Sequence, residues 1–295
     1  MTHAQSSLEK LQLSKIEALL TTSWLGQSDH ANELWKTIDS TNNRAMELAR
    51  LGAPHGVMVI ASEQSAGRGR NGNQWLSPAG SGVYISFLIR PNLATVNLPV
   101  ITLVAGVAVT KAIQGYLGIE IGLKWVNDLI VDGKKVGGIL SEYVASNKQS
   151  ESYNTKSPNE NMPALIIGIG LNIRQSNMQL PAELEQKMGF LDTAVQGPGD
   201  KNLIDSNQLV ASIANELEIA FDQVQAGQLS ILLDQWRAYS ITLGEEIVAN
   251  IGDKQIIGQA LDITNSGELI VKTKAGNVTL SAGEVSIRKP GGTYI

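Results

Sequence analysis

The chain has 295 residues, of which 43% are hydrophobic, and this is enough for one large domain and a smaller one. It contains no cysteine, which excludes disulfides, thiolate catalysis and cysteine-ligated zinc, and its three histidines are scattered along the sequence. A net charge of −5 argues against nucleic acid as the principal partner. Because we find neither a membrane-length apolar run nor a secretory signal, we expect a cytoplasmic protein without a membrane partner.

The sequence predicts helices and short strands in the first part of the chain. Apolar residues recur at helical spacing near the N-terminus, and Ser40 or Thr41 is a natural N-cap for a second helix. A third helix is more uniformly apolar and is expected to be buried. The expected elements are helices over 8–20 and 97–117, a strand end, cap and helix over 37–51, and strands over 57–62 and 82–90.

A glycine-rich loop with two arginines follows the first of these strands. Arg68 and Arg70 lie among Gly67, Gly69 and Gly72. Exposed backbone amides in such a loop form an anion-binding concavity, and arginine is a permanently charged fork for carboxylates and phosphates. The loop is therefore predicted to order around a small anion. A solvated turn or a nonspecific RNA-binding segment would have the same composition.

The next informative stretch, 122–144, predicts a β-hairpin. Its turn is Asp132-Gly133, with a strand expected over 136–144. Lys134 is expected to be exposed to solvent beside this turn.

Two lysines of this stretch are expected to face one site from neighbouring strands. Lys124 precedes the hairpin and Lys135 opens its second strand, with Asn127 and Asp128 at the edge of the site. The glycine pair that follows Lys135 permits close approach of a ligand.

Another strand, 164–173, carries Gly168 and Gly170 two residues apart, so both are expected on the same face. The missing side chains leave a slot, which either an apolar ligand or another backbone would fill.

The remaining elements complete the predicted architecture. Residues 145–162 are polar and predict a mobile insertion between two strands. Helices are expected over 203–226 and 231–239. From Gly244 onward, short strands with glycine turns favour a small SH3-like barrel.

Taken together, these segments resemble the biotin protein ligase family, in order and at compatible spacings from about Trp35 to Arg288. The motifs are Asp39-Ser-Thr-Asn42, Gln64-Ser-Ala-Gly-Arg-Gly-Arg-Asn-Gly72 with Trp75, Lys124-Trp-Val-Asn-Asp128, Lys135-Val-Gly-Gly-Ile-Leu140 and Gly168-Ile-Gly-Leu-Asn172. The resemblance implies an α+β fold: a mixed sheet flanked by helices, class II synthetase-like, with the SH3-like barrel at the C-terminus. The expected domains are an N-terminal helical extension (1–34), a biotin- and ATP-binding catalytic domain (35–242) and the barrel (243–295).

The resemblance also implies a two-step reaction. Biotin and Mg-ATP give biotinyl-5′-AMP, and biotin then passes to a lysine of an acceptor, expected to be the biotin carboxyl carrier protein of acetyl-CoA carboxylase. Some members carry a winged-helix DNA-binding domain before the Asp39 motif. Only 38 residues precede Asp39 here, so we expect a short form that does not bind DNA or act as a repressor. Monomer and homodimer both stay open.

The family's site residues transfer to matching positions of this chain. Lys135 would bridge the biotin carboxylate and the α-phosphate, and Arg68 and Arg70 would hold these anions and pyrophosphate. Lys124, Asn127 and Asp128 occupy positions for ATP and the acceptor lysine. We leave open whether Asp128 holds Mg²⁺ or orients the amine.

The other positions are expected to bind biotin or the nucleotide. Ser40, Thr41 and Gln64 would face the ureido ring, Asn172 the ribose or adenine, and Phe190 would stack on adenine. Trp75 is predicted to pack within the loop. The full set of binding residues is Ser40, Thr41, Asn42, Gln64, Gly67, Arg68, Gly69, Arg70, Asn127, Lys135, Gly138, Leu140, Gly168, Gly170, Asn172 and Phe190.

One departure and two competing functions accompany the resemblance. Val126 stands where the family usually has proline, and valine at this position would fit a strand. Lipoate ligases and octanoyl transferases share the catalytic fold. A non-catalytic module that binds biotin or nucleotide would not require Lys135, Arg70 and Asp128 together.

Overall fold

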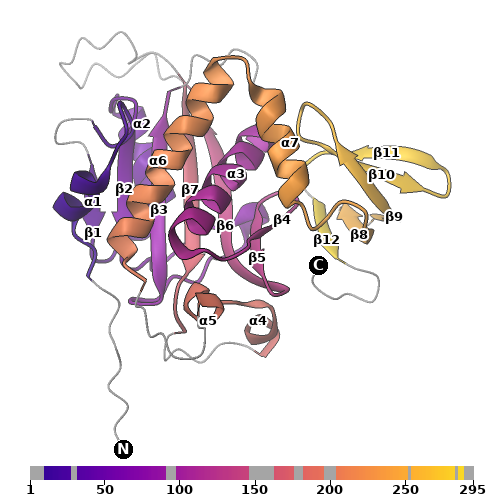
Figure 1. The fold of residues 1–295 in the computed structure, drawn as a ribbon, viewed down its shortest axis with the longest axis horizontal. Helices are drawn as coiled ribbons and strands as arrows, with labels where there is room; N and C mark the ends of the chain where they lie inside the picture. The colour runs from indigo at the N-terminus through magenta and orange to yellow at the C-terminus, as the bar shows by residue number, and fades with distance from the viewer. Residues whose placement is uncertain are drawn as a thin grey trace, which may run out of the picture.

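The computed structural model describes most of the chain in eight stretches: residues 10–27, 32–90, 98–145, 163–175, 182–195, 204–251, 254–282 and 285–288. They form a mixed seven-stranded sheet covered on both faces by helices, with a second, antiparallel sheet at the C-terminus (Figure 1). The expected α+β architecture is thereby confirmed.

The large sheet has the strand order β1-β2-β3-β7-β6-β5-β4, with β1 and β2 parallel and every other neighbouring pair antiparallel. Its strands are β1 (Glu33–Trp35), β2 (Val57–Ala61), β3 (Gly82–Ile89), β4 (Gly122–Lys124), β5 (Asp128–Val131), β6 (Lys134–Val144) and β7 (Ala164–Asn172). The predicted boundary after residue 34 falls within β1.

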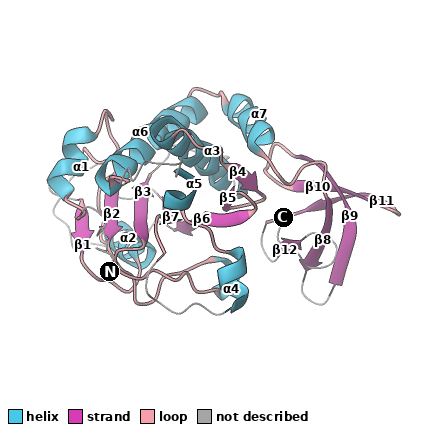
Figure 2. Cartoon of the chain, turned by 60° about the horizontal axis from the view of Figure 1, so that its bottom comes forward, coloured by secondary structure: helices cyan, strands magenta, loops and turns pink. Residues whose placement is uncertain are grey.

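The helices cover the two faces of this sheet unequally, as Figure 2 shows. α3 and α6 lie over one face, and α2 lies against the other. The helices are α1 (Leu13–Leu19), α2 (Thr41–Arg50), α3 (Leu98–Leu117), α4 (Ala182–Lys187), α5 (Leu191–Val195), α6 (Ser206–Gln225) and α7 (Leu229–Tyr239).

Both faces of the central strands are buried, because alternate side chains enter different cores. In β3, Ile85 and Phe87 pack on the α3 side, whereas Leu88 packs against Ala45 of α2. Every residue of β3 is consequently buried. Ser86, which alternates with Ile85 and Phe87, faces α2 and bonds Thr41 and Asn42, and this is the side on which the site lies.

The helix α3 is buried, as its composition predicts. Within the part of the chain that the structure describes, it is the one helix long and apolar enough to cross a membrane, and 72% of its most apolar window is buried inside the protein. It packs between the sheet and α6 and is the central helix of the larger core.

The first helix is shorter than the sequence predicts. Residues 8 and 9 lie outside the described part, and α1 begins only at Leu13 because Gln12 is extended. The Gln12 N–H donates to Asn207 Oδ1 of α6 over 2.7 Å, and the Thr21 N–H donates to Asn215 Oδ1 over 2.9 Å. These two amide side chains fix the backbone on either side of α1.

The hairpin turn is as predicted. Asp132 and Gly133 both have positive φ (49° and 72°), which a two-residue hairpin turn of type I′ requires. Lys134 is exposed beside it, also as predicted.

Val126 lies in the turn between β4 and β5 and not in a strand, and the peptide bond that precedes it is cis. The insertion expected at 145–162 lies, apart from Ala145, outside the described residues.

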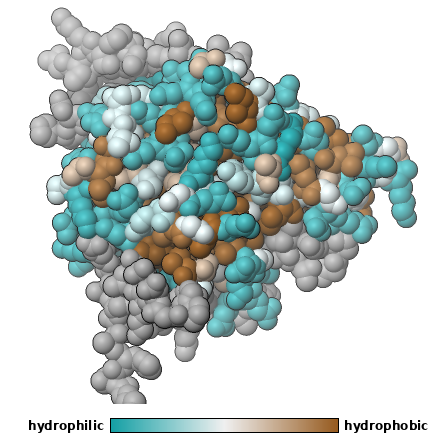
Figure 3. Space-filling model, viewed as in Figure 1, coloured by the Kyte–Doolittle hydropathy of each residue, from teal (hydrophilic) through white to brown (hydrophobic). Residues whose placement is uncertain are grey.

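The C-terminal strands form a five-stranded antiparallel sheet in the order β11-β10-β9-β8-β12. They are β8 (Glu246–Ile251), β9 (Lys254–Ile263), β10 (Leu269–Thr273), β11 (Gly276–Leu280) and β12 (Val285–Arg288). Figure 3 shows the face of the molecule formed by the helices, where apolar atoms lie in separate patches divided by polar ones. The first strand of this sheet follows α7 closely, and β12 returns to the large domain.

Candidate functional site

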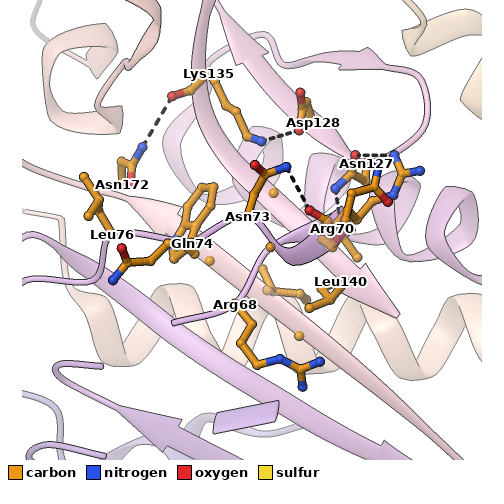
Figure 4. A pocket seen from close by; sticks show the side chains of 18 of the residues that line it. Arg68, Arg70, Asn73, Gln74, Leu76, Asn127, Asp128, Lys135, Leu140 and Asn172 are labelled. Atoms are coloured by element: carbon orange, nitrogen blue, oxygen red, sulfur yellow. Dashed lines mark hydrogen bonds and ion pairs between the residues drawn. The ribbon is translucent and has the colours of Figure 1, made fainter. Parts of the chain in front are cut away.

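A cavity of about 410 Å³ lies on the α2 side of the large sheet. It is lined by the start of α2, Gln64, the glycine–arginine loop, the β4–β5 turn with its flanking residues, β6, β7, α4 with the residue after it, and the end of β12. Figure 4 shows Lys135, Asp128, Arg70 and Asn127 near one another in it. Lys135 and Arg70, which the sequence predicted to act together, thus share one cavity.

Glycines form the floor of this cavity. In the β6–β7 register Gly138 pairs with Gly170 and Leu140 pairs with Gly168. A Cβ at Gly170 would lie 2.5 Å from Trp75 Nε1, and one at Gly168 would lie 2.0 Å from Asn42 Oδ1. In the part of the chain that the structure describes, an indole and an amide therefore lie over these two glycines, and no second backbone packs against them.

Trp75 is part of the site, and the prediction that it merely packs the loop is wrong. Its ring lies over the glycine floor, and Lys135 Nζ is 5.2 Å from the ring centroid, within cation–π range. The signal was present in the sequence, since a large aromatic side chain close to a basic loop complements strands from which side chains are missing.

A chain of hydrogen bonds runs beneath the cavity from the loop to α2. Gln64 Nε2 donates to Ser77 Oγ over 2.8 Å, while Gln64 Oε1 accepts from the Thr41 N–H over 2.8 Å. Ser86 Oγ of β3 lies 2.8 Å from the Thr41 hydroxyl and 2.6 Å from Asn42 Oδ1. Thr41, Asn42, Ser77 and Ser86 are buried and Gln64 is half-buried, and each is hydrogen-bonded, so the chain holds the first turn of α2 in place.

Ser40 is the N-cap of α2, as expected. Its hydroxyl accepts from the Asn43 N–H over 3.5 Å.

The glycine–arginine loop closes on itself and is tied to β6. The Trp75 N–H donates to the Gly67 carbonyl over 2.9 Å, and the Gly69 N–H donates to the Asn73 carbonyl over 2.7 Å. From this loop Arg68 reaches Glu142 of β6, and its Nη2 lies 2.6 Å from Glu142 Oε1.

Lys124 and Lys135 are not on neighbouring strands, because β5 lies between β4 and β6. The residue between them is Asp128 of β5, which forms an ion pair with Lys135. Both lysines still line the cavity. Asn127 is fixed beside them, since its Nδ2 donates to the Ile139 carbonyl over 2.9 Å.

Burial changes the acid–base properties of two cations in the site. The pKa of Lys124, which is only 2% exposed, falls to about 7 because of burial, and Asp128 opposes this fall. Burial also lowers the pKa of Arg70, again against the attraction of Asp128. The guanidinium of Arg70 lies beside Asn127, with Nη1 3.4 Å from Asn127 Oδ1.

The structure brings most of the predicted residues together. Those lining the cavity are Ser40, Thr41, Asn42, Gln64, Arg68, Gly69, Arg70, Lys124, Asn127, Asp128, Lys135, Gly138, Leu140, Gly168, Gly170 and Asn172.

Two predicted residues do not line the cavity. Gly67 lies under the loop, where a Cβ would be 2.4 Å from the Trp75 carbonyl oxygen. Phe190 lies beyond α4, between that helix and α5, so stacking on a ligand in this cavity is not supported.

The sequence did not predict several residues that line the cavity, and five of them come from two segments remote from the motifs. α4 and the residue after it contribute Leu184, Lys187 and Met188, and β12 contributes Ile287 and Arg288. No local motif marks them. The Gly189 N–H donates to the Lys135 carbonyl over 2.8 Å, which brings this segment against β6.

The charges of the cavity suit an anionic ligand. Its cations come from five segments and include Arg70, Lys124, Lys135, Lys187 and Arg288, whereas its carboxylate is that of Asp128. Across the described stretches no three His, Cys, Asp or Glu side chains are grouped to hold a metal ion. A single carboxylate still fits Mg²⁺ that is held mainly by phosphate oxygens, which is the usual arrangement for that ion.

Known protein families match most of this chain. The Biotin/lipoate A/B protein ligase family matches residues 34–154, and the Biotin protein ligase C terminal domain matches residues 242–288. The bifunctional ligase/repressor BirA of Bacillus subtilis is 31% identical over 278 residues, covering 94% of this chain and 79% of that protein.

A second relative and a solved structure agree with these matches. The biotin–[acetyl-CoA-carboxylase] ligase of Mycobacterium tuberculosis is 30% identical, covering 85% of this chain and 89% of that protein. The biotin protein ligase of Aquifex aeolicus, solved with biotin and ATP, is 27% identical with a TM-score of 0.70, covering 88% of this chain and 99% of the other. These matches, together with the family's motifs around one cavity, show that the chain belongs to the biotin protein ligase family.

Proposed function

We propose that this protein activates biotin with ATP and transfers it to a lysine of a carrier protein. The observation that carries the proposal is that Lys135 and Arg70 line one cavity with Asp128 between Lys135 and Lys124. The names of the relatives, a biotin–[acetyl-CoA-carboxylase] ligase among them, and the Aquifex structure with biotin and ATP support it.

In the first step a carboxylate oxygen of biotin attacks the α-phosphorus of ATP. The new O–P bond gives biotinyl-5′-AMP, and the bond to the bridging oxygen breaks to release pyrophosphate. Two anions must meet, so the site has to supply positive charge and dipoles aimed at both. Lys135 and Arg70 supply this charge, and Asp128 orients the Lys135 ammonium through their ion pair.

In the second step a neutral lysine amine attacks the carbonyl carbon of the mixed anhydride. The amide bond forms, the C–O bond to AMP breaks, and the amine proton is lost. Asp128 would have one of two roles here: it would orient this amine, or it would hold Mg²⁺, which when bound neutralises phosphate charge.

The floor of the cavity suits the rest of biotin. Thr41, Gln64 and Ser40 offer hydroxyl and amide groups to the ureido ring, and Leu140 with the glycines accommodates the apolar part. Because Trp75 lies over these glycines, we expect its indole to shift or to cover the bound ligand.

The test is incubation with biotin, Mg-ATP and a biotin carboxyl carrier domain, followed by mass spectrometry of the carrier. We expect a biotinyl-lysine, and biotin-dependent exchange of pyrophosphate into ATP without the carrier. Lipoate and octanoate in place of biotin are the matched controls. Exchange with lipoate but not biotin would assign the protein to the other branch of the family, and no exchange with any acid would indicate a binding module.

Further features stay predictions. They are the carrier of acetyl-CoA carboxylase as acceptor, a cytoplasmic location, and the absence of DNA binding and repression. The state of assembly is left between monomer and homodimer. A gel-shift assay with biotinyl-AMP present would test DNA binding directly.

A further inference from the structure

We propose that Glu142, at the far end of β6 from Lys135, is a positioning residue that fastens the glycine–arginine loop over the cavity through Arg68. The effect on catalysis rests on the proposed function, whereas the effect on the loop does not. Glu142 belongs to none of the binding positions considered above and does not line the cavity.

The contact between Glu142 and Arg68 is a two-pronged ion pair. Arg68 Nη2 lies 2.6 Å from Glu142 Oε1, and Arg68 Nη1 lies 3.0 Å from Glu142 Oε2. Parallel N–H···O bonds between charged groups are stronger and more directional than neutral hydrogen bonds. The Glu142 side chain is 20% exposed and the Arg68 side chain 37%, so the pair is partly screened by water and its two-pronged geometry is what makes it directional.

The same carboxylate also holds the floor of the cavity. Asn42 Nδ2 donates to Glu142 Oε2 over 2.8 Å, and the Asn42 amide lies directly over Gly168. Glu142 therefore joins three elements: β6, the loop through Arg68, and the first turn of α2 through Asn42. Loss of its charge would loosen the loop and the floor together.

This arrangement gives the two loop arginines different tasks. Arg68 Nη1 also donates to Asn43 Oδ1 over 2.9 Å, so its guanidinium is held by Glu142 and α2 together. In Figure 4 it points away from Lys135 and Asp128. Arg70 lies instead beside Asn127, on the side of the cavity where Lys135 and Asp128 are. We infer that Arg70 contacts the ligand's anionic groups, while Arg68 holds the loop in place.

The first experiment measures loop opening without any ligand. Limited trypsin digestion is followed by mass spectrometry, scoring cleavage after Arg70 against cleavage after Lys134, which is exposed at the start of β6. Glu142→Gln should speed cleavage after Arg70 by about tenfold, the size of a typical coupling between charged partners. Cleavage after Lys134 should not change.

The matched control is Glu33→Gln. Glu33 makes a comparable pair with Arg44 outside the cavity, at 2.7 Å and with a side chain that is 22% exposed. It should leave both cleavage rates at the wild-type value. Equal cleavage after Arg70 in wild type and Glu142→Gln, or parallel increases at both sites, would overturn the proposal.

The second experiment measures release of biotinyl-AMP made by the enzyme, using Glu142→Gln, Arg68→Gln and the double variant. Each single variant should release the adenylate about tenfold faster, and the double variant no faster than either. If the increases in release rate were additive in the double variant, or much larger for Arg68→Gln than for Glu142→Gln, Arg68 would act directly on the ligand and the inference would be overturned.

The two proposals fail in different ways. If wild-type protein makes no adenylate from biotin and Mg-ATP, the proposed function is wrong, but the trypsin comparison still decides the role of Glu142. If Glu142→Gln does not fold, Arg68→Gln tests the same contact from the loop. Unchanged cleavage after Arg70 in that variant would count against the proposal.

Discussion

Lys124 shows how the fold shapes a single side chain for work on an anion. It ends β4 with 2% of its surface exposed, and burial is the main cause of its lowered pKa. Arg288, Lys135 and Lys187 lower this pKa further, whereas Asp128 raises it. A bound triphosphate would reverse the balance and favour the charged ammonium, so ligand binding should take up a proton near neutral pH.

The buried lysine predicts a pH dependence of stability. Its pKa is about 7 in the folded protein and 10.5 ordinarily, so between these values the unfolded chain holds more protons. The free energy of unfolding therefore rises with pH across this window, by at most about 1.4 kcal/mol per pH unit. Urea denaturation at pH 7, 8 and 9 should show the rise in wild type and a flatter profile in Lys124→Met. Lys134→Met, at an exposed position, should keep the wild-type slope, and an unchanged slope in Lys124→Met would refute the assignment.

Lys135 should matter most for the chemical step. Lys135→Ala removes the cation that lies between Trp75 and Asp128. Loss of one such preorganised donor costs about 2.7–4 kcal/mol of transition-state stabilisation, so pyrophosphate exchange should fall about 100-fold or more. Lys134→Ala, one residue earlier on the same strand and exposed, is the control and should exchange normally. A fall of less than about threefold would remove Lys135 from this role.

At the scale of elements, β7 must pass close beneath two side chains. Gly168→Ala would place a Cβ 2.0 Å from Asn42 Oδ1, and Asn42 cannot move freely because Ser86 and Glu142 bond it. We expect a loss of about 1–3 kcal/mol in the free energy of unfolding, as for other overpacked sites.

Denaturation with urea measures this loss, with Gly115→Ala as the control. Gly115 lies in α3 with no atom within 4 Å of an added Cβ, and alanine there should stabilise the helix slightly. Equal stabilities for the two variants would show that the strand tolerates a side chain at Gly168.

The same elements show what sequence alone could predict. The Asp132-Gly133 turn, the apolar helix α3 and the buried strand β2 were predictable, because local backbone preference and hydrophobic pattern agree there. The length of α1 was not, since the backbone on either side of it is bonded by two asparagines of α6 that lie almost 200 positions away. Side chains acting across such distances leave no local periodicity.

The sequence predicted those residues of the site that lie in recognisable motifs. Lys135, Arg70 and Asp128 were assigned to one cavity correctly because each stands in a motif with a specific backbone requirement. Arg288 and Lys187 were missed because only the packing of β12 and α4 brings them to the cavity. Phe190 does not line the cavity, and its stacking on adenine stays a prediction.

At the scale of the whole molecule, the C-terminal sheet completes the cavity. Ile287 and Arg288 of β12 line it, and the turn between β9 and β10 accepts a buried hydrogen bond from the catalytic domain. The donor is Trp125 Nε1, 3.0 Å from the Gly267 carbonyl oxygen, and the Trp125 N–H donates to Thr242 Oγ1 over 2.9 Å. One tryptophan thus ties the turn that carries Asp128 to the strands that deliver Arg288.

Trp125→Phe should loosen this connection. The phenyl ring keeps much of the buried area but leaves the Gly267 carbonyl without its donor, which costs about 1–3 kcal/mol of unfolding free energy. Because Arg288 and Asp128 would then be held less firmly relative to one another, KM for ATP should rise while KM for biotin changes little. The matched control is Trp35→Phe, since the Trp35 ring is 39% exposed and its indole bonds the half-buried Glu33 carboxylate outside the cavity. That variant should stay within about 0.5 kcal/mol of wild type. If both variants lose the same stability, or if KM for biotin rises as much as KM for ATP, the C-terminal sheet does not act on the nucleotide end of the cavity through Trp125.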